Sequence, residues 1–270
     1  MKTLKDKVVW ITGASSGIGE ALAQVCAGEG ARLVLTARRE EELLRVARQT
    51  QLPEESLFIL PADLSQYDQA GNLARQVMEH FGRIDVLFNN AGISSRAIAL
   101  ESPVEIDRKV MDLDYFGAIA LTKAVAPGMV ERKEGHIVVT SSVMGKIGTP
   151  MRSAYSAAKH ALHGFFESLR MEIDGTGVQV TILCPGYIHT QVSVNAITAS
   201  GAKFNKMSRY QQNGKDAVLF AHKVIRGMKK GKHEISYGGV EILGPLLYRL
   251  SPKIVHLYMK KQQKKSSYSE

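Results

Sequence analysis

Short apolar segments alternate along the chain with longer segments in which apolar residues recur every three or four positions. The short segments are nearly continuous in apolar and β-branched residues, which is typical of strands covered on both faces. They span residues 7–12, 32–37, 56–62, 84–90, 136–142 and 178–184. Strand and helix therefore alternate six times, which predicts an α/β fold with a three-layer, doubly wound parallel sheet.

Glycines mark the places where several predicted helices end. Gly28, Gly30 and Gly82 follow segments with helical spacing, and glycine is common just after a helix C-terminus. With right-handed crossovers, the carboxyl ends of the strands meet at one edge of the sheet, where ligands bind. Residues 186–213 are weakly patterned, and we expect them to form a long loop at this edge.

The composition is that of a soluble globular protein, with 44% hydrophobic and 23% charged residues in a chain of 270. Two cysteines, Cys26 and Cys184, are too few for a disulfide framework and favour a reducing compartment. No apolar stretch reaches the roughly 20 residues that a membrane-spanning helix needs. The N-terminus lacks the apolar core of a signal peptide. We therefore expect a cytoplasmic protein.

Positive charge is concentrated near the C-terminus. The net charge is +9, and residues 222–270 carry eleven Lys and Arg against three Glu, so the first 221 residues are nearly neutral. The final stretch mixes lysines with apolar residues and is divided by Pro245 and Pro252. We therefore expect one domain over residues 1–240 and a basic, apolar helical extension over residues 241–270.

This extension has two open interpretations. Its apolar residues could bury against a partner subunit in a homodimer or homotetramer, with the basic end in solvent. Alternatively, apolar and basic residues together could make a peripheral membrane contact. Nucleic-acid binding is not favoured, because no motif that reads RNA or DNA accompanies the charge.

Three glycines, Gly13, Gly17 and Gly19, lie between the first predicted strand and the first predicted helix. Without Cβ atoms, the backbone can approach a pyrophosphate closely, and the helix N-terminus supplies N–H groups and a positive dipole end. This strand–turn–helix context predicts a dinucleotide site. The other residues of the loop that we assign to it are Ser15, Ser16 and Ile18.

The end of the second predicted strand indicates which dinucleotide binds. An acid there would bind the ribose 2′-hydroxyl of NAD, whereas arginine suits the 2′-phosphate of NADP. Arg38 and Arg39 follow the strand, and the first carboxylate is Glu40. A guanidinium matches a phosphate, so we predict that NADP(H) is preferred over NAD(H). The alternative is that both arginines are solvated residues at the start of a helix.

Tyr155 and Lys159 lie four residues apart in a segment with helical spacing, so their side chains share one face. A phenol ordinarily titrates near pH ~10, and a neighbouring ammonium favours its ionised form. The spacing is that of a proton donor with a supporting cation. On its own, it also fits a pair on a helix surface.

Five motifs together resemble the short-chain dehydrogenase/reductase family. They are TGASSGIG at 12–19, NNAG at 89–92, the serine at 142, YSAAK at 155–159 and PGYIHT at 185–190. The resemblance covers about residues 5–235 and implies a Rossmann fold and an oxidoreductase that acts on CH–OH donors with a nicotinamide cofactor. Within the family, residues 144–170 are most similar to the 11β-hydroxysteroid dehydrogenase group.

The resemblance implies roles for the catalytic residues. Tyr155 would be the general acid in ketone reduction, and its phenolate would be the base in alcohol oxidation. Lys159 would favour the phenolate and bridge the hydroxyls of the nicotinamide ribose. Ser142 would donate a hydrogen bond to the substrate oxygen, with Ser141 as a rival one residue away.

The resemblance also implies cofactor contacts in the loops after three strands. These contacts are Asp63 and Leu64 for the adenine, Asn90, Ala91 and Gly92 for its ribose, and Pro185, Gly186, Ile188 and Thr190 around the nicotinamide carboxamide.

Asp114 departs from the family pattern, which usually has asparagine at this position to hold a water for proton relay. An ionised aspartate can accept a hydrogen bond from that water but cannot donate one. It would also weaken the effect of Lys159 on Tyr155. This departure is the one feature that favours an alternative function, a non-catalytic or weakly active NADP(H)-binding regulatory or interaction protein.

The substrate is expected to be a small hydrophobic ketone, aldehyde or alcohol. The segments that would line its pocket are residues 93–100, 143–154 and 186–213, and they include Met144, Met151 and Tyr187. Metal chemistry is not expected. His160 and His163 form no recognised ligand pattern, and we assign them structural roles.

Overall fold

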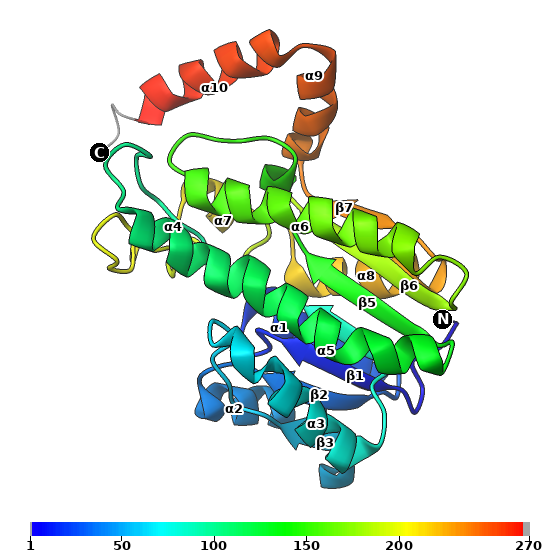
Figure 1. Ribbon diagram of the computed structural model, residues 1–270. Coiled ribbons are helices and arrows are strands. Elements are labelled where there is room, and N and C mark those ends of the chain that lie inside the picture. Colours follow the sequence, from blue (N-terminus) through cyan, green and yellow to red (C-terminus); the bar gives the residue numbers. More distant parts are fainter. Residues whose placement is uncertain (1, 267–270) are drawn as a thin grey trace.

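The computed structural model describes residues 2–266, which form one seven-stranded parallel sheet between two layers of helices (Figure 1). The strands run in the order β3-β2-β1-β4-β5-β6-β7. The strands are β1 (Val8–Thr12), β2 (Arg32–Thr36), β3 (Leu57–Ile59), β4 (Val86–Asn89), β5 (Gly135–Thr140), β6 (Val178–Pro185) and β7 (Glu234–Tyr237). The strand order reverses between β1 and β4, which places the ligand-binding edge at their carboxyl ends.

The predicted doubly wound fold is confirmed, but the sequence analysis found only six of the seven strands. It missed β7, which pairs with β6 at the edge of the sheet. This strand has four residues, and only Ile235 among them is buried. Its sequence, EISY, alternates polar and apolar residues and so lacks the continuous apolar run by which the other strands were found.

Ten α-helices connect and extend the strands of the described chain. They are α1 (Gly17–Gly28), α2 (Glu40–Thr50), α3 (Ala70–Phe81), α4 (Val104–Met111), α5 (Gly117–Glu131), α6 (Ser153–Glu172), α7 (Arg209–Gln212), α8 (Ala217–Lys229), α9 (Gly244–Leu250) and α10 (Pro252–Ser266). The predicted stops hold in two places: α1 ends at Gly28, and Gly82 follows α3 with a left-handed φ of 72°. Residues 186–213 contain isolated bridges, turns and the short α7.

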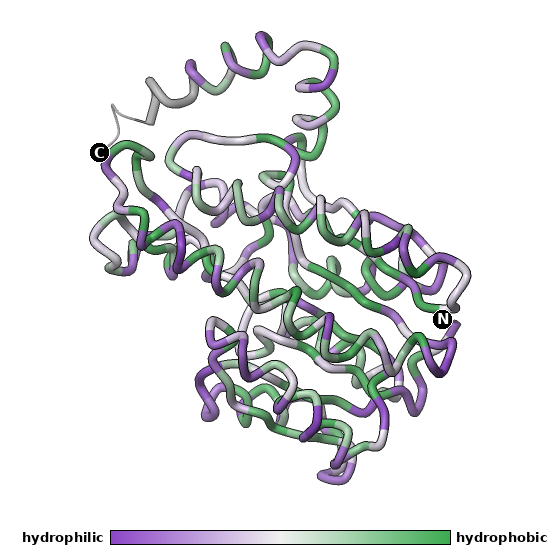
Figure 2. The backbone as a smooth tube through the Cα atoms, in the orientation of Figure 1, coloured by the Kyte–Doolittle hydropathy of each residue, from purple (hydrophilic) through white to green (hydrophobic). Residues whose placement is uncertain are grey.

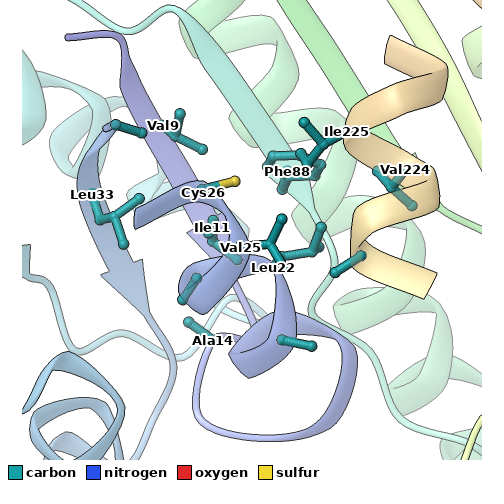
Figure 3. Packing of buried hydrophobic residues seen from close by; sticks show 14 of the residues in the cluster. Val9, Ile11, Ala14, Leu22, Val25, Cys26, Leu33, Phe88, Val224 and Ile225 are labelled. Atoms are coloured by element: carbon teal, nitrogen blue, oxygen red, sulfur yellow. The ribbon is translucent and has the colours of Figure 1, made fainter. Parts of the chain in front are cut away.

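The core lies on both faces of the sheet. On one face, Val9 and Ile11 of β1 pack with Cys26 of α1 and Val224 of α8 (Figure 3). On the other face, Trp10 of β1 packs with residues of α3, α5 and α6. Successive β1 side chains therefore point to opposite faces and are all buried. This two-sided burial explains why the strands appear in the sequence as unbroken apolar runs.

The C-terminal extension is helical, as expected. Pro245 lies in the first turn of α9 and Pro252 opens α10, positions where proline costs no helical hydrogen bond. Both helices lie apart from the two layers that cover the sheet (Figure 1). Figure 2 shows apolar and polar residues alternating along the described part of this extension.

Candidate active site

The glycine loop between β1 and α1 has the shape that a dinucleotide phosphate requires. Gly13 and Gly17 have φ values of 63° and 58°, which favour glycine. A Cβ on Gly19 would lie 2.2 Å from the Gly13 carbonyl oxygen, so no side chain fits there. Ser16 precedes α1 and its side chain makes no capping hydrogen bond, which leaves the first N–H groups of the helix available for an anion.

Arg45 of α2 holds this loop, and the sequence analysis missed it. Its Nη2 donates to the Ser15 carbonyl oxygen at 3.2 Å, and it forms ion pairs with Glu20 and Glu42. Hydrogen bonds to Glu20 and Glu42 raise the pKa of Arg45, so the guanidinium remains charged. Glu42 lies three residues away, a spacing that the sequence displays. Glu20 lies on another helix, a contact that no local pattern reveals.

The NNAG segment ties β1, β4 and β5 together next to the glycine loop. Asn90 Nδ2 donates to the Thr12 carbonyl oxygen at 3.1 Å, and its Oδ1 accepts from Thr140 Oγ1 at 3.1 Å. A Cβ on Gly13 would lie 2.8 Å from Ala91 Cα. The Asn90 side chain is therefore engaged by the scaffold, and the backbone of this segment faces the predicted cofactor edge.

Arg38 and Arg39 lie just beyond β2 and are exposed. Neither forms an ion pair in the part of the chain that the structure describes, but the charge of Arg39 adds to the hydrogen bond from Arg45 in lowering the pKa of Glu42. Asp63, after β3, is half-buried, and its Oδ1 accepts from the Ser65 hydroxyl at 2.8 Å. Leu64 is 6% exposed and packs in the core, so it can offer a ligand only its backbone.

The loop after β6 reaches back to the glycine loop. Pro185 ends β6, and a Cβ on Gly17 would lie 2.9 Å from Thr190 Cγ2. Gln211 Nε2 donates to the Ile188 carbonyl oxygen and, at 3.1 Å, to Thr190 Oγ1. The segments predicted to contact the two ends of a dinucleotide therefore meet at the same sheet edge.

Tyr155 and Lys159 lie on one face of α6, as their spacing predicts. The Lys159 ammonium lies 5.5 Å from the centroid of the Tyr155 ring. Tyr155 is half-buried, and its backbone N–H donates to Ser95 Oγ at 3.3 Å. The phenol therefore has a fixed backbone, a nearby cation and access to a ligand.

Lys159 is almost completely buried, with 4% of its surface exposed. Its Nζ donates to the Thr140 carbonyl oxygen at 3.0 Å and lies 3.0 Å from Asp114 Oδ2. Burial acts to lower the pKa of Lys159, but the charges of Asp114 and Tyr155 outweigh it and raise the pKa. Lys159 therefore remains an ammonium beside the phenol.

Asp114 lies in a π-helical segment, Asp112–Phe116, that leads into α5, and it is completely buried. Its Oδ1 accepts from the Ile93 backbone N–H at 2.7 Å. A Cβ on Gly92 would lie 2.9 Å from Asp114 Oδ2. Glycine at position 92 therefore leaves space for the carboxylate.

Two opposing effects act on the Asp114 carboxyl. Burial raises the pKa of Asp114 above its ordinary value, because it outweighs the Lys159 charge and the Ile93 N–H, which act to lower that pKa. A neutral Asp114 would leave the buried ammonium without a counterion, which is the costlier state. We therefore describe Asp114 and Lys159 as a buried carboxylate–ammonium pair.

The two candidate serines have different partners. Ser141 Oγ donates to the Lys159 carbonyl oxygen at 3.1 Å, so its proton is engaged by α6. Ser142 Oγ instead accepts from the Met144 N–H at 3.1 Å, which leaves the Ser142 proton available to a substrate oxygen. This difference favours Ser142 over Ser141.

Arg152 lies one helical turn before Tyr155 and was missed by the sequence analysis. Its Nη1 donates to Ser94 Oγ at 2.8 Å and to the Ser95 carbonyl oxygen at 2.6 Å. Burial and the charge of Arg96 lower the pKa of Arg152. Arg152 therefore holds the segment after NNAG against the start of α6. The only sign of this residue in the sequence is its position three residues before Tyr155.

A cavity of about 310 Å³ opens at the carboxyl ends of β6 and β7. Tyr187 stacks on Tyr210 there, with ring centroids 5.2 Å apart. The lining residues are Tyr187, Arg209, Tyr210, Asn213, Lys215, Gly239 and Glu241. Of the three pocket residues named from the sequence, Tyr187 lines this cavity, whereas Met144 and Met151 do not.

Other reactive side chains in the described chain have structural partners. Within residues 2–266, no group of three or more His, Cys, Asp or Glu is arranged to hold a metal ion. Burial raises the pKa of the Cys184 thiol to about 12, and its Sγ lies 3.6 Å from His163 Nε2. His160 Nδ1 lies 2.7 Å from the Ser156 carbonyl oxygen.

Among the residues that the structure describes, no helix combines the length and apolar character needed to cross a membrane.

Comparison with known proteins is consistent with this geometry. A protein from Mus musculus, dehydrogenase/reductase SDR family member 7B, is 43% identical over 236 residues, which cover 86% of this chain and 73% of the mouse protein. A protein from Anopheles gambiae, dehydrogenase/reductase SDR family protein 7-like, is 41% identical over 268 residues, covering 97% of this chain and 84% of its own.

Solved structures agree. A short chain dehydrogenase/reductase from Burkholderia phymatum in complex with NAD superposes with a TM-score of 0.81 at 27% identity, covering 96% of this chain and 97% of that one. A metagenomic short-chain oxidoreductase in complex with NADP gives a TM-score of 0.71 at 29% identity, with coverages of 87% and 97%. The family model for short chain dehydrogenases matches residues 7–200. The chain therefore belongs to the short-chain dehydrogenase/reductase family, the oxidoreductases that act on CH–OH donors with a nicotinamide cofactor.

Proposed function

We propose that this protein is an NADP(H)-dependent oxidoreductase that interconverts a hydrophobic ketone or aldehyde and the corresponding alcohol. One observation carries the proposal: Tyr155 is half-buried with the Lys159 ammonium 5.5 Å from its ring centroid. A phenol in this position can donate its proton to a substrate oxygen, while the buried ammonium stabilises the negative charge that remains on the phenol oxygen.

In the reductive direction, Tyr155 donates its phenolic proton to the substrate oxygen. NADPH, when bound, supplies the hydride. Ser142 donates a hydrogen bond to the same oxygen, because its own Oγ already accepts from Met144 and its proton is free. Lys159 stabilises the negative charge that remains on Tyr155 and is kept protonated by Asp114.

Asp114 lowers the net positive charge near Tyr155, compared with a site that has a neutral residue at this position. The carboxylate lies 3.0 Å from the Lys159 nitrogen and offsets part of its charge. The attraction between Lys159 and a phenolate at Tyr155 is therefore weaker than with an unpaired ammonium. We infer that the site is better suited to donating a proton from Tyr155 than to removing one from an alcohol.

The preference for NADP(H) rests on Arg38 and Arg39. Both are exposed at the end of β2 and form no ion pair within residues 2–266, so both guanidinium groups can meet a 2′-phosphate. Among the structural relatives, the Burkholderia phymatum protein holds NAD and the metagenomic protein holds NADP. The choice therefore depends on residues of this chain rather than on the fold.

The hydrophobic character proposed for the substrate rests on Met144 and Met151, which lie between Ser142 and Tyr155 in the sequence, and on Tyr187, which lines the cavity after β6. Family members act on small molecules and generally form oligomers. The homodimer or homotetramer and the cytoplasmic location remain predictions from the sequence.

The test is a panel of hydrophobic ketones and aldehydes with NADPH, comparing the wild type with Tyr155→Phe. We expect the variant to lose at least about a thousandfold in turnover, because phenylalanine has no proton to donate. Its NADPH affinity, measured by fluorescence titration, should be nearly unchanged. Tyr67→Phe, at an exposed tyrosine outside α6 whose ring packs on Phe116, is the matched control. Retained activity in Tyr155→Phe would refute the assignment.

A second candidate is a weakly active or non-catalytic NADP(H)-binding protein, which the partial neutralisation of Lys159 by Asp114 favours. The same panel separates the two functions. NADPH binding without turnover of any compound would support the second candidate. Turnover that depends on Tyr155 would exclude it.

A further inference from the structure

The C-terminal helices α9 and α10 expose an unusual amount of apolar surface. They lie apart from the helix layers that cover the sheet and chiefly contact each other and the turn before α9 (Figure 1). Their most exposed apolar side chains, with exposed fractions, are Leu246 (57%), Leu247 (49%), Leu250 (76%), Ile254 (62%) and Leu257 (57%). An exposed apolar face of this kind is typical of a surface that binds a protein, a membrane or a ligand.

The outer face of α10 is both apolar and basic. Leu257, Lys260 and Lys261 lie four, seven and eight positions after Lys253, so these four residues share one side of the helix, and all four are exposed. Val255 turns the other way and is only 7% exposed. In the sequence, no Asp or Glu occurs between Glu241 and Glu270, so nothing on this segment offsets the lysines.

We propose that α9 and α10 dock on an anionic lipid membrane and lie along its surface. A lipid interface offers acyl chains to the leucines and Ile254, and negative headgroups to Lys253, Lys260 and Lys261. No helix of the described chain could span a bilayer, so this contact stays at the surface.

Charge decides between a membrane and a second copy of the chain. In a two-fold interface the same patch meets itself, which would bring the lysines of two α10 helices together. Docking on the body of another copy offers little compensation, because the first 221 residues are close to neutral. Anionic lipid therefore fits both properties of this surface better than a second copy does.

The extension is anchored beside the predicted substrate segments. Glu241 Oε1 accepts from the Tyr187 N–H at 2.8 Å and from the Gly239 N–H at 2.9 Å. A Cβ on Gly244, the first residue of α9, would lie 3.4 Å from Ile147 Cδ1. Docking would therefore hold the loops after β5 and β6 close to the membrane.

The test is flotation of the full chain with phosphatidylcholine vesicles, with and without phosphatidylserine. We expect binding to the phosphatidylserine vesicles at low salt, little binding to the neutral vesicles, and release at high salt as charge is screened. Each lysine near an anionic surface strengthens partitioning roughly fivefold. The triple variant Lys253→Gln/Lys260→Gln/Lys261→Gln should therefore bind about a hundredfold more weakly.

Two matched controls separate this surface from general charge and hydrophobicity. Replacing exposed lysines elsewhere, as in Lys109→Gln/Lys133→Gln/Lys230→Gln, should leave vesicle binding within about twofold of the wild type. Ile254→Asp/Leu257→Asp should abolish binding. Leu100→Asp/Met171→Asp, which places acids at exposed apolar positions of the body, should not. Thermal melting and NADPH titration check that each variant is folded.

Three results would overturn the proposal. One is no flotation with phosphatidylserine vesicles at low salt. Another is an equal loss in the control lysine variant. The third is an oligomer, seen by sedimentation, that Ile254→Asp/Leu257→Asp dissociates while the wild type ignores vesicles, since α9 and α10 would then bind a second copy. None of these readouts requires turnover, so they test membrane docking independently of the proposed enzymatic function.

Discussion

The catalytic centre and the cofactor-selecting end of β2 hold their positive charges in opposite ways. Lys159 is 4% exposed and is fixed by Asp114 and the Thr140 carbonyl oxygen. Arg38 and Arg39 are exposed and make no ion pair within residues 2–266. The buried charge is part of the fold, so changing it should alter both stability and rate. The exposed charges are available to bind a phosphate, so changing them should alter only the selectivity between NADPH and NADH.

The largest effect is expected from Lys159→Met. Removing the ammonium takes away the charge that stabilises ionised Tyr155, and kcat/KM should fall about a thousandfold. It also leaves Asp114 buried without a counterion, which should lower the free energy of unfolding by about 3 kcal/mol. Steady-state kinetics and urea unfolding measure the two losses. A variant that loses activity but keeps full stability would contradict a buried pair.

A double variant sharpens this result. Lys159→Met/Asp114→Asn removes both charges, so most of the lost stability should return while activity does not.

The sign of the pH dependence of stability follows from the pKa of Lys159. Because the pKa of Lys159 is raised in the fold, the contribution of its ammonium to stability is fully present below the ordinary lysine pKa of about 10.4 and is lost as pH rises through the folded value. The double variant should lack this alkaline loss of stability.

The next largest effect is expected from Arg38→Ala/Arg39→Ala. Losing two charge-assisted contacts to the 2′-phosphate should lower kcat/KM for NADPH about a hundredfold and leave that for NADH nearly unchanged. Thermal stability should not change, because neither side chain is part of the packed structure. Arg48→Ala, at another exposed arginine of α2, is the control. Equal losses with NADPH and NADH would exclude phosphate recognition by these arginines.

A smaller effect is expected from Asp114→Asn. The amide keeps an acceptor for the Ile93 N–H but no longer offsets the charge of Lys159. Alcohol oxidation should become about tenfold faster, because Lys159 then stabilises negative charge on Tyr155 more strongly. Asp112→Asn, two residues away in the same π-helical segment, should not change this rate. A slower Asp114→Asn enzyme would mean that the carboxylate assists catalysis.

Much of this molecule could be predicted from the sequence because most of its strands are buried on both faces and are therefore continuous apolar runs. The glycine loop, the Tyr155–Lys159 pair and six strands all depend on local patterns. The β7 strand was missed because its four residues, EISY, alternate polar and apolar side chains, whereas the equally exposed β3 is a continuous apolar run. Arg45–Glu20 and Arg152–Ser95 escaped because each joins residues that only the fold brings together.

The choice between Ser141 and Ser142 shows the same limit at the scale of one residue. Both follow β5 and both are buried, so composition and burial do not distinguish them. What distinguishes them is the direction of a hydrogen bond: Ser141 donates to α6, whereas Ser142 accepts from Met144. Such a direction depends on how a helix docks beside a strand end, and the local sequence does not encode it.

The smallest expected effect is a response to salt, and it tests the comparison without any mutation. The screening length of the solvent falls from about 10 Å at 0.1 M salt to about 3 Å at 1 M. Exposed Arg38 and Arg39 should therefore attract the 2′-phosphate less strongly, and KM for NADPH should rise severalfold while KM for NADH changes little. The Asp114–Lys159 pair is buried from solvent, so kcat at saturating NADPH should stay constant. In Arg38→Ala/Arg39→Ala the salt effect on KM should disappear. If kcat fell with salt as steeply as KM rose, the buried pair would be open to solvent and the contrast between the two regions would fail.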